Sequence, residues 1–225
     1  MFGEMFLKLW EKGLIQLGVW ETIYMTLIST ALAYLVGLPL GLLLRCTDAD
    51  GIRPVRWLNR SVGAIVNALR SIPFIILMVA MLPAAKLIVG TSMGNKAMIV
   101  MLFIAAAPYI SRMVETAVRE VDGGIIEAAQ AMGCTDWDII WKVLVPEAKP
   151  GLLSGAVIST VTILGYSAMA GTIGGTGLGQ IAITYGYQRF QNDVVWVCVI
   201  LSVLIVQLIQ MFGGRLVSRC DKRKR

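Results

Sequence analysis

The stretch EAAQAMGCTDWDIIWKVLVPEAKPG, residues 127–151, places six charged side chains in the middle of a chain that is otherwise strongly apolar. Its first part is rich in helix-forming residues, and Gly133 follows where a helix end commonly needs a residue with positive φ. Thr135 and Asp138 then have the spacing of a capping box, which starts a second helix. We therefore predict a folded insert of two short helices over about residues 122–149.

The two predicted helices present different surfaces. In the first, Ala128 and Ala129 leave a low surface that another protein can approach. We expect Pro146 to end the second helix, because proline lacks the backbone N–H that continues a helix, and Pro150 to open the segment that follows. The apolar side of the second helix comprises Ile139, Ile140, Val143 and Leu144. The plainer alternative is a loop helix that only covers its own helix bundle.

The composition indicates a membrane protein. The chain of 225 residues is 57% hydrophobic and 15% charged, with a mean hydropathy of +0.75, whereas soluble domains average about 25% charged residues. The net charge of +6 could also indicate a nucleic-acid partner. The basic bias of cytoplasmic loops explains it more simply, so we expect a lipid environment and no nucleic acid.

Cysteine and histidine usage excludes several kinds of site. The sequence has no histidine, and its four cysteines are scattered without a CxxC pair, which argues against a zinc site or a disulfide scaffold. The N-terminus has acidic residues and no basic region ahead of an apolar run, unlike a secretory signal. Its apolar residues recur at helical spacing, as in an interfacial helix or in the first turns of the span that follows. They are Phe2, Met5, Phe6, Leu9, Trp10 and Leu14.

Five segments are apolar enough to cross a membrane, for which a helix needs about 20 residues. They are residues 21–45, 61–85, 94–111, 151–171 and 194–214. Residues 150–188 carry no charge, and their division into two spans is the alternative, but their second half is rich in glycine. The prediction is a single all-α membrane domain over residues 1–225, with five transmembrane helices and the insert between the third and the fourth.

Basic residues predict the orientation, because cytoplasmic loops carry an excess of Lys and Arg. With five spans, fourteen basic residues fall on the side of the insert and five on the other. The fourteen are Arg45, Arg53, Arg56, Arg60, Arg112, Arg119, Lys142, Lys149, Arg215, Arg219, Lys222, Arg223, Lys224 and Arg225. The five are Lys8, Lys12, Lys86, Lys96 and Arg189. We expect an extracytoplasmic N-terminus, and the insert and C-terminus in the cytoplasm.

The insert resembles the EAA signature of ABC importer permeases, EAA-x3-G-x9-I-x-L-P. Glu127 begins the EAA triplet, Gly133 follows at the family's distance, and Pro146 closes the motif. Val143 and Val145 replace the usual Ile and Leu and keep the apolar character. In this family the insert is the coupling helix, which docks in a groove of a cytoplasmic ATPase. The resemblance implies an ATPase-coupling role for Glu127, Ala128, Ala129, Met132, Gly133 and Pro146.

Other segments look like the methionine-importer permeases over nearly the whole chain. They are residues 70–77 (RSIPFIIL), 106–115 (AAPYISRMVE), 165–171 (GYSAMAG) and 174–180 (GGTGLGQ). The resemblance implies a bacterial cell-membrane protein that imports methionine and close analogues. It also implies a permease homodimer, two ATPase subunits that bind ATP and Mg²⁺, and an extracytoplasmic methionine-binding lipoprotein. One insert per chain against two grooves in an ATPase dimer favours the same twofold arrangement.

The chain is not expected to be an enzyme or to bind a cofactor or metal itself. It has no GxxxxGK[ST] loop for ATP, and the glycine-rich GGTGLG at residues 174–179 has no following lysine. That segment is expected to be a plain turn, a re-entrant turn, or part of the surface that the binding protein meets. No Ser–Lys or paired-Asp arrangement lies inside the spans, which argues against an intramembrane enzyme.

Two residues inside the spans are further candidates. Arg70 is an intramembrane charge and so a functional candidate, although it could reach the cytoplasmic face or pair with Glu115 in a structural role. Met169 could be an apolar gate of a central pathway, although methionine is more often packing filler.

The alternatives are a permease for another amino acid or small solute, or an ATP-independent channel or secondary transporter. The latter two would leave the capped insert unexplained, and no internal repeat of the kind common in secondary transporters is visible.

Overall fold

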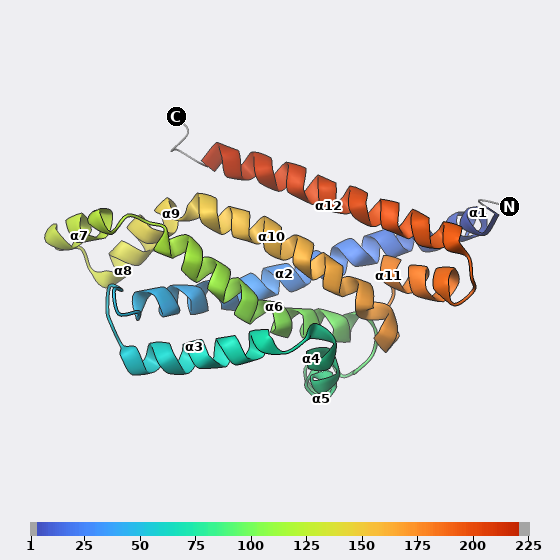
Figure 1. The fold of residues 1–225 in the computed structure, drawn as a ribbon, viewed down its shortest axis with the longest axis horizontal. Helices are drawn as coiled ribbons and strands as arrows, with labels where there is room; N and C mark the ends of the chain where they lie inside the picture. Colours follow the sequence, from blue (N-terminus) through green and yellow to red (C-terminus); the bar gives the residue numbers. More distant parts are fainter. Residues whose placement is uncertain (1–3, 221–225) are drawn as a thin grey trace. The chain divides into compact units, whose positions relative to one another are not determined.

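The computed structural model describes residues 4–220, which are helical nearly throughout. The helices are α1 (Glu4–Glu11), α2 (Leu14–Cys46), α3 (Arg56–Ser71), α4 (Phe74–Ala80), α5 (Leu82–Val89), α6 (Gly94–Arg119), α7 (Gly123–Ala131), α8 (Asp136–Asp138), the π-helix η1 (Ile139–Leu144), α9 (Val145–Glu147), α10 (Lys149–Ser167), the 3₁₀-helix η2 (Ala168–Ile173), α11 (Leu178–Ile181), the π-helix η3 (Ala182–Tyr187) and α12 (Asn192–Cys220) (Figure 1). Phe2, the side chains of Met5 and Phe6, and the tail residues 222–225 lie outside the described part.

Contacts divide the chain into two compact units. The first comprises residues 1–31, 73–105 and 160–210, and the second comprises residues 32–72, 106–159 and 211–225. Four long helices, α2, α6, α10 and α12, therefore contribute residues to both units.

The same four helices are long and apolar enough to cross a membrane on their own. They contain or overlap four of the five predicted spans and extend beyond most of their ends; α6, for example, continues eight residues past the predicted end at Ser111, to Arg119. Of these four, α12 is the least covered: only 17% of its most apolar window is buried.

The predicted second span, residues 61–85, is not one continuous helix. The helices α3 and α4 meet the requirements for a span only when they are taken together across a break at Ile72 and Pro73. Ile72 has extended backbone angles, with φ −81° and ψ 125°, because the residue before a proline is disfavoured in the helical region. Within residues 4–220 the count is therefore four spans, or five with this broken one.

The first unit packs around a cluster of buried apolar side chains. Its members are Leu9, Ile15, Leu164, Leu178, Ile181, Val194, Cys198 and Ile205. Leu9 belongs to α1, which is a helix of its own because Gly13, with φ +69°, separates it from α2. The N-terminal apolar residues from Met5 to Trp10 thus belong to a separate helix and not to the first turns of the span, whereas Leu14 is the first residue of α2.

The glycine-rich segment 174–179 is fixed within the first unit. Thr176 and Asn95 exchange two hydrogen bonds of 2.7 Å each, and the Leu178 N–H donates to the Thr22 hydroxyl at 3.0 Å. A Cβ atom added at Gly179 would lie 2.1 Å from the Ala168 carbonyl oxygen. The glycines in this segment therefore allow a tightly packed turn.

In the second unit, α2 and α6 approach each other closely through two glycines. A Cβ atom added at Gly37 would lie 2.7 Å from Cγ2 of Ile110, and one added at Gly41 would lie 2.4 Å from the Ser111 carbonyl oxygen. The two glycines are four residues apart and so share one helix face. Small residues at this spacing allow helix backbones in membranes to come together.

We expect Gly41→Ala to destabilise the protein by about 1–3 kcal/mol, because the added methyl group overpacks the contact with α6. The midpoint of thermal unfolding of the detergent-purified protein should fall by several degrees. Gly214→Ala is the control, since a Cβ atom there meets nothing within 4 Å. Equal midpoints for the two variants would show that the α2–α6 contact is not tight.

Candidate functional site

The insert begins with α7, which is capped at both ends. The Asp122 Oδ1 accepts a hydrogen bond from the Gly124 N–H at 2.9 Å. At the other end Gly133 has φ +78°, its N–H donates to the Gln130 carbonyl at 2.9 Å, and the Cys134 N–H donates to the Ala129 carbonyl at 3.1 Å. This pair of bonds is a Schellman motif, and it confirms the predicted helix end at Gly133.

The second helix of the insert starts at the predicted cap. The Asp138 N–H donates to the Thr135 Oγ1 at 3.3 Å, and the Thr135 hydroxyl donates to the Asp138 Oδ2 at 2.6 Å. Lys142 adds an ion pair, with 2.6 Å between its Nζ and the Asp138 Oδ1. The hydrogen bond from Lys142, together with that from Thr135, lowers the pKa of the Asp138 carboxyl. The same bond raises the pKa of the Lys142 ammonium.

Pro146 does not end the second helix, contrary to the prediction. Residues 139–144 form a π-helical turn, in which the Val145 N–H donates to the Ile140 carbonyl five residues earlier. Helical structure continues through Pro146 as far as Glu147. Because Pro146 is the second residue of α9, where an N–H would have no partner within that short helix, its lack of a donor does not stop the chain.

One side of the insert is buried and the other is exposed. Ile139 and Leu144 are 0% and 1% exposed, as expected for the apolar side of the second helix. α7 lies beside this helix (Figure 1). Ala129 is buried as well. Of the two alanines that were expected to form a surface for another protein, only Ala128 is exposed.

The exposed side of the insert carries large apolar side chains. Met132 is 77% exposed and Trp137 is 67% exposed. Trp141, which is 44% exposed, packs edge-on against Trp137 with 5.7 Å between the ring centroids. The sequence prediction included Met132 but not the two tryptophans, although both belong to the quoted stretch.

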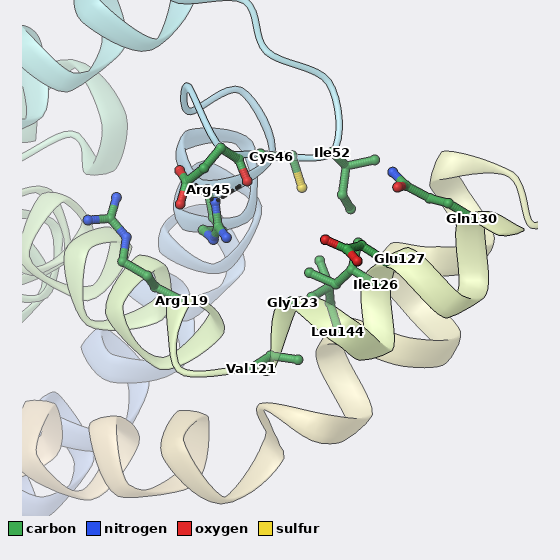
Figure 2. Close-up of a pocket in the computed structure, with 12 residues that line it drawn as sticks. Arg45, Cys46, Ile52, Arg119, Val121, Gly123, Ile126, Glu127, Gln130 and Leu144 are labelled. Atoms are coloured by element: carbon green, nitrogen blue, oxygen red, sulfur yellow. Dashed lines mark hydrogen bonds and ion pairs between the residues drawn. The ribbon is translucent and has the colours of Figure 1, made fainter.

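A cavity of about 450 Å³ lies between α7 and the loop that follows α2. Figure 2 shows Glu127 and Gln130 extending from α7 towards Ile52 and Cys46 on the opposite wall. Glu127 is exposed. Glu127, the first residue of the predicted motif, thus faces an open cavity.

The two intramembrane candidates belong to other helices than the insert. Arg70 is exposed in the last turn of α3. The suggested partner Glu115 instead pairs with Arg112, at 2.6 Å, and with Arg119, at 3.1 Å. Met169 is partly buried in η2, and its carbonyl accepts a hydrogen bond from the Thr172 hydroxyl at 2.7 Å. The gate role of Met169 remains a prediction.

The sequence prediction did not include the ion pairs at the end of α6. The i,i+3 and i,i+4 spacing of Arg112, Glu115 and Arg119 is a recognisable signal for ion pairs on a helix. Within residues 4–220, no group of three or more His, Cys, Asp or Glu side chains is arranged to hold a metal ion.

Comparisons with known proteins agree with one another. Residues 37–223 match the family described as "Binding-protein-dependent transport system inner membrane component". The chain is 47% identical to the probable D-methionine transport system permease protein MetI of Vibrio cholerae, over 95% of both chains. It is 53% identical to the D-methionine transport system permease protein MetI of Escherichia coli K12, over 68% of this chain and 71% of that one.

Solved structures give the same result. The structure is similar to a chain of the MetNI methionine ABC transporter in an inward-facing conformation, with a TM-score of 0.92 and 48% identity over 94% of this chain and 98% of that one. An amino acid ABC transporter with histidines shares the fold at 16% identity, with a TM-score of 0.79 over 97% of this chain and 100% of that one.

The capping network predicts how the insert responds to pH. A carboxyl with a lowered pKa in the folded state stabilises the fold above its ordinary pKa, here 3.8, and this contribution is lost as the pH falls through the lowered value. Amide protection of residues 135–144, measured by hydrogen exchange and corrected for the intrinsic pH dependence, should be constant near neutral pH and decrease only in acid. Asp138→Asn should be less protected at neutral pH and show no further acid loss. An acid loss of the same size in the variant would assign it to another group.

Proposed function

Because the chain belongs to the family of binding-protein-dependent transport system inner membrane components, we propose that it is the permease subunit of an ATP-driven importer for methionine. Methionine is proposed as the substrate because the chain is 47% identical, over 95% of its length, to a permease named for D-methionine transport. The chain is a membrane transport subunit, and ATP hydrolysis belongs to a partner subunit.

The insert is the docking element for that ATPase. Three properties support this role: α7 is capped at both ends, it projects an exposed face with Glu127 and Ala128, and exposed apolar side chains continue from Met132 to Trp137. Exposed apolar side chains on a polar segment commonly mark a protein contact. Gly133 and Pro146 shape the two helices around this face.

The assembly in this proposal has two copies of the chain, two ATPase subunits that bind ATP and Mg²⁺, and an extracytoplasmic methionine-binding lipoprotein. The single domain lies in the bacterial inner membrane with its N-terminus outside and the insert inside. The sparsely buried α12 is then covered by lipid or by the second copy. Met169 acts as an apolar gate, and Arg70 stabilises the membrane boundary of α3.

Closure of the ATPase dimer moves α7, and the spans then change between inward- and outward-facing arrangements. Reversing a 1:99 population of two such arrangements requires about 5.5 kcal/mol of differential binding. A helix held by hydrogen bonds at both ends can transmit a displacement that a slack loop would absorb.

Transport by the reconstituted complex tests the substrate. Proteoliposomes that contain the chain with its ATPase, supplied with the binding protein, should accumulate labelled L- or D-methionine only when ATP is present on the ATPase side. Uptake without ATP would indicate a channel or secondary transporter. If another amino acid is taken up in an ATP-dependent way and methionine is not, the chain is still an importer subunit, but methionine is rejected as its substrate.

Docking is tested by Gly133→Val. A β-branched residue in the left-handed region costs about 1–2 kcal/mol, so we expect about fivefold or greater loss of ATPase recovered with the tagged chain from native membranes. Gly90→Val is a matched control, because Gly90 also ends a helix at φ +78° with nothing within 4 Å of an added Cβ. Equal loss in both variants, or none in either, would contradict docking through the insert.

A further inference from the structure

A buried carboxylate joins two arginines near the end of α6. Glu115 is only 8% exposed. Its Oε2 lies 2.6 Å from Nη1 of Arg112, and its Oε1 lies 3.1 Å from Nη2 of Arg119. A buried charge is stable when it is paired, and removal of its partner leaves an uncompensated charge.

Each arginine also binds a segment far away in the sequence. The Arg112 Nη2 donates to Asn67 Oδ1 at 3.0 Å and to the Gly63 carbonyl at 3.3 Å, both on α3. Arg119 donates to the carboxylate of Asp48, in the loop that follows α2. Glu115 is therefore the centre of a network that connects α6 to α3 and to this loop.

The network lies directly beside the insert. Three residues, Glu120, Val121 and Asp122, connect the end of α6 to α7. Val121 is 5% exposed, and Asp122 is the cap of α7. A displacement of α7 therefore acts on the turn of α6 that carries Arg119.

We propose that Glu115 is a positioning residue, which makes α6, α3 and the loop after α2 move as one body with α7. This inference rests on the proposed function, because the movement of α7 comes from the ATPase. Without the carboxylate, Arg112 and Arg119 lose the acceptor that orients both guanidinium groups and have only their mutual repulsion. Their contacts with α3 and with the loop after α2 are then weakened. ATP hydrolysis then continues, but it displaces the spans less effectively.

The first test compares Glu115→Gln with wild type in the reconstituted complete transporter. We expect the methionine transported per ATP hydrolysed to fall at least about fivefold, the lower end of the range for coupling between sites, with hydrolysis largely retained. Glu11→Gln is the matched control, because it makes the same exchange at an exposed position of α1, which contributes no residue to the network or to the connection with α7. An unchanged ratio, or a parallel fall of uptake and hydrolysis, would overturn the proposal in favour of a purely structural role.

The second test does not depend on the substrate. Spin labels at Ser61 on α3 and Gln130 on α7, both exposed, are placed in the full complex after the four native cysteines have been replaced. The distance between them should stay constant in wild type between the nucleotide-free and ATP-trapped states, and it should change in Glu115→Gln. A wild-type distance that changes as much as in the variant would overturn the role of Glu115. A wild type that hydrolyses ATP without importing methionine would reject only the proposed substrate.

Discussion

The close contact between α2 and α6 at Gly37 and Gly41 is the constraint on which the second unit depends. In lipid, helices gain little from the hydrophobic effect when they associate, so backbone proximity and polar contacts hold them together. α6 then supports the remainder of the unit: Arg112 binds α3, Arg119 binds the loop after α2, and three residues lead to α7. A shift of α6 would therefore also displace the insert and its contacts.

The insert is held mainly by local hydrogen bonds. The Schellman motif at Gly133 and the cap at Thr135 satisfy backbone groups at the turn between its two helices. Ile139 and Leu144 anchor the second helix by burial. Local hydrogen bonds determine the shape of the insert, and the burial of Ile139 and Leu144 determines its position on the rest of the unit. The exposed face of α7 is consequently free to bind a partner without disturbing either.

The sequence predicts the features that local hydrogen bonds determine better than those that depend on burial. The C-terminal end of α7 and the start of the next helix depend on neighbouring residues, so the glycine and capping signals at Gly133 and Thr135 identified them, whereas the Asp122 cap was not predicted. The burial of Ala129 depends on packing against residues 139–144. Apart from Glu115, the partners of Arg112 and Arg119 lie in α3 and in the loop after α2, which no local pattern reveals. Pro73 is evident in the sequence, but a hydropathy average over residues 61–85 includes it and so does not reveal the break between α3 and α4. At Pro146 the local rule was misleading, because the π-helical turn before it accommodates the proline.

The polar character of α3 affects its insertion into the membrane during synthesis of the chain. α3 does not meet the requirements for a span by itself, and it carries Arg56, Arg60 and Arg70. These arginines lie near the two ends of the helix, where long basic side chains can reach the membrane boundary. Asn67 of α3 accepts a hydrogen bond from Arg112 of α6, which the ribosome synthesises later. Asn59 of α3 donates one to the Leu44 carbonyl of α2, which is synthesised earlier. The polar contacts of α3 are therefore shared between a helix made before it and one made after it, and the set is complete only once α6 has emerged.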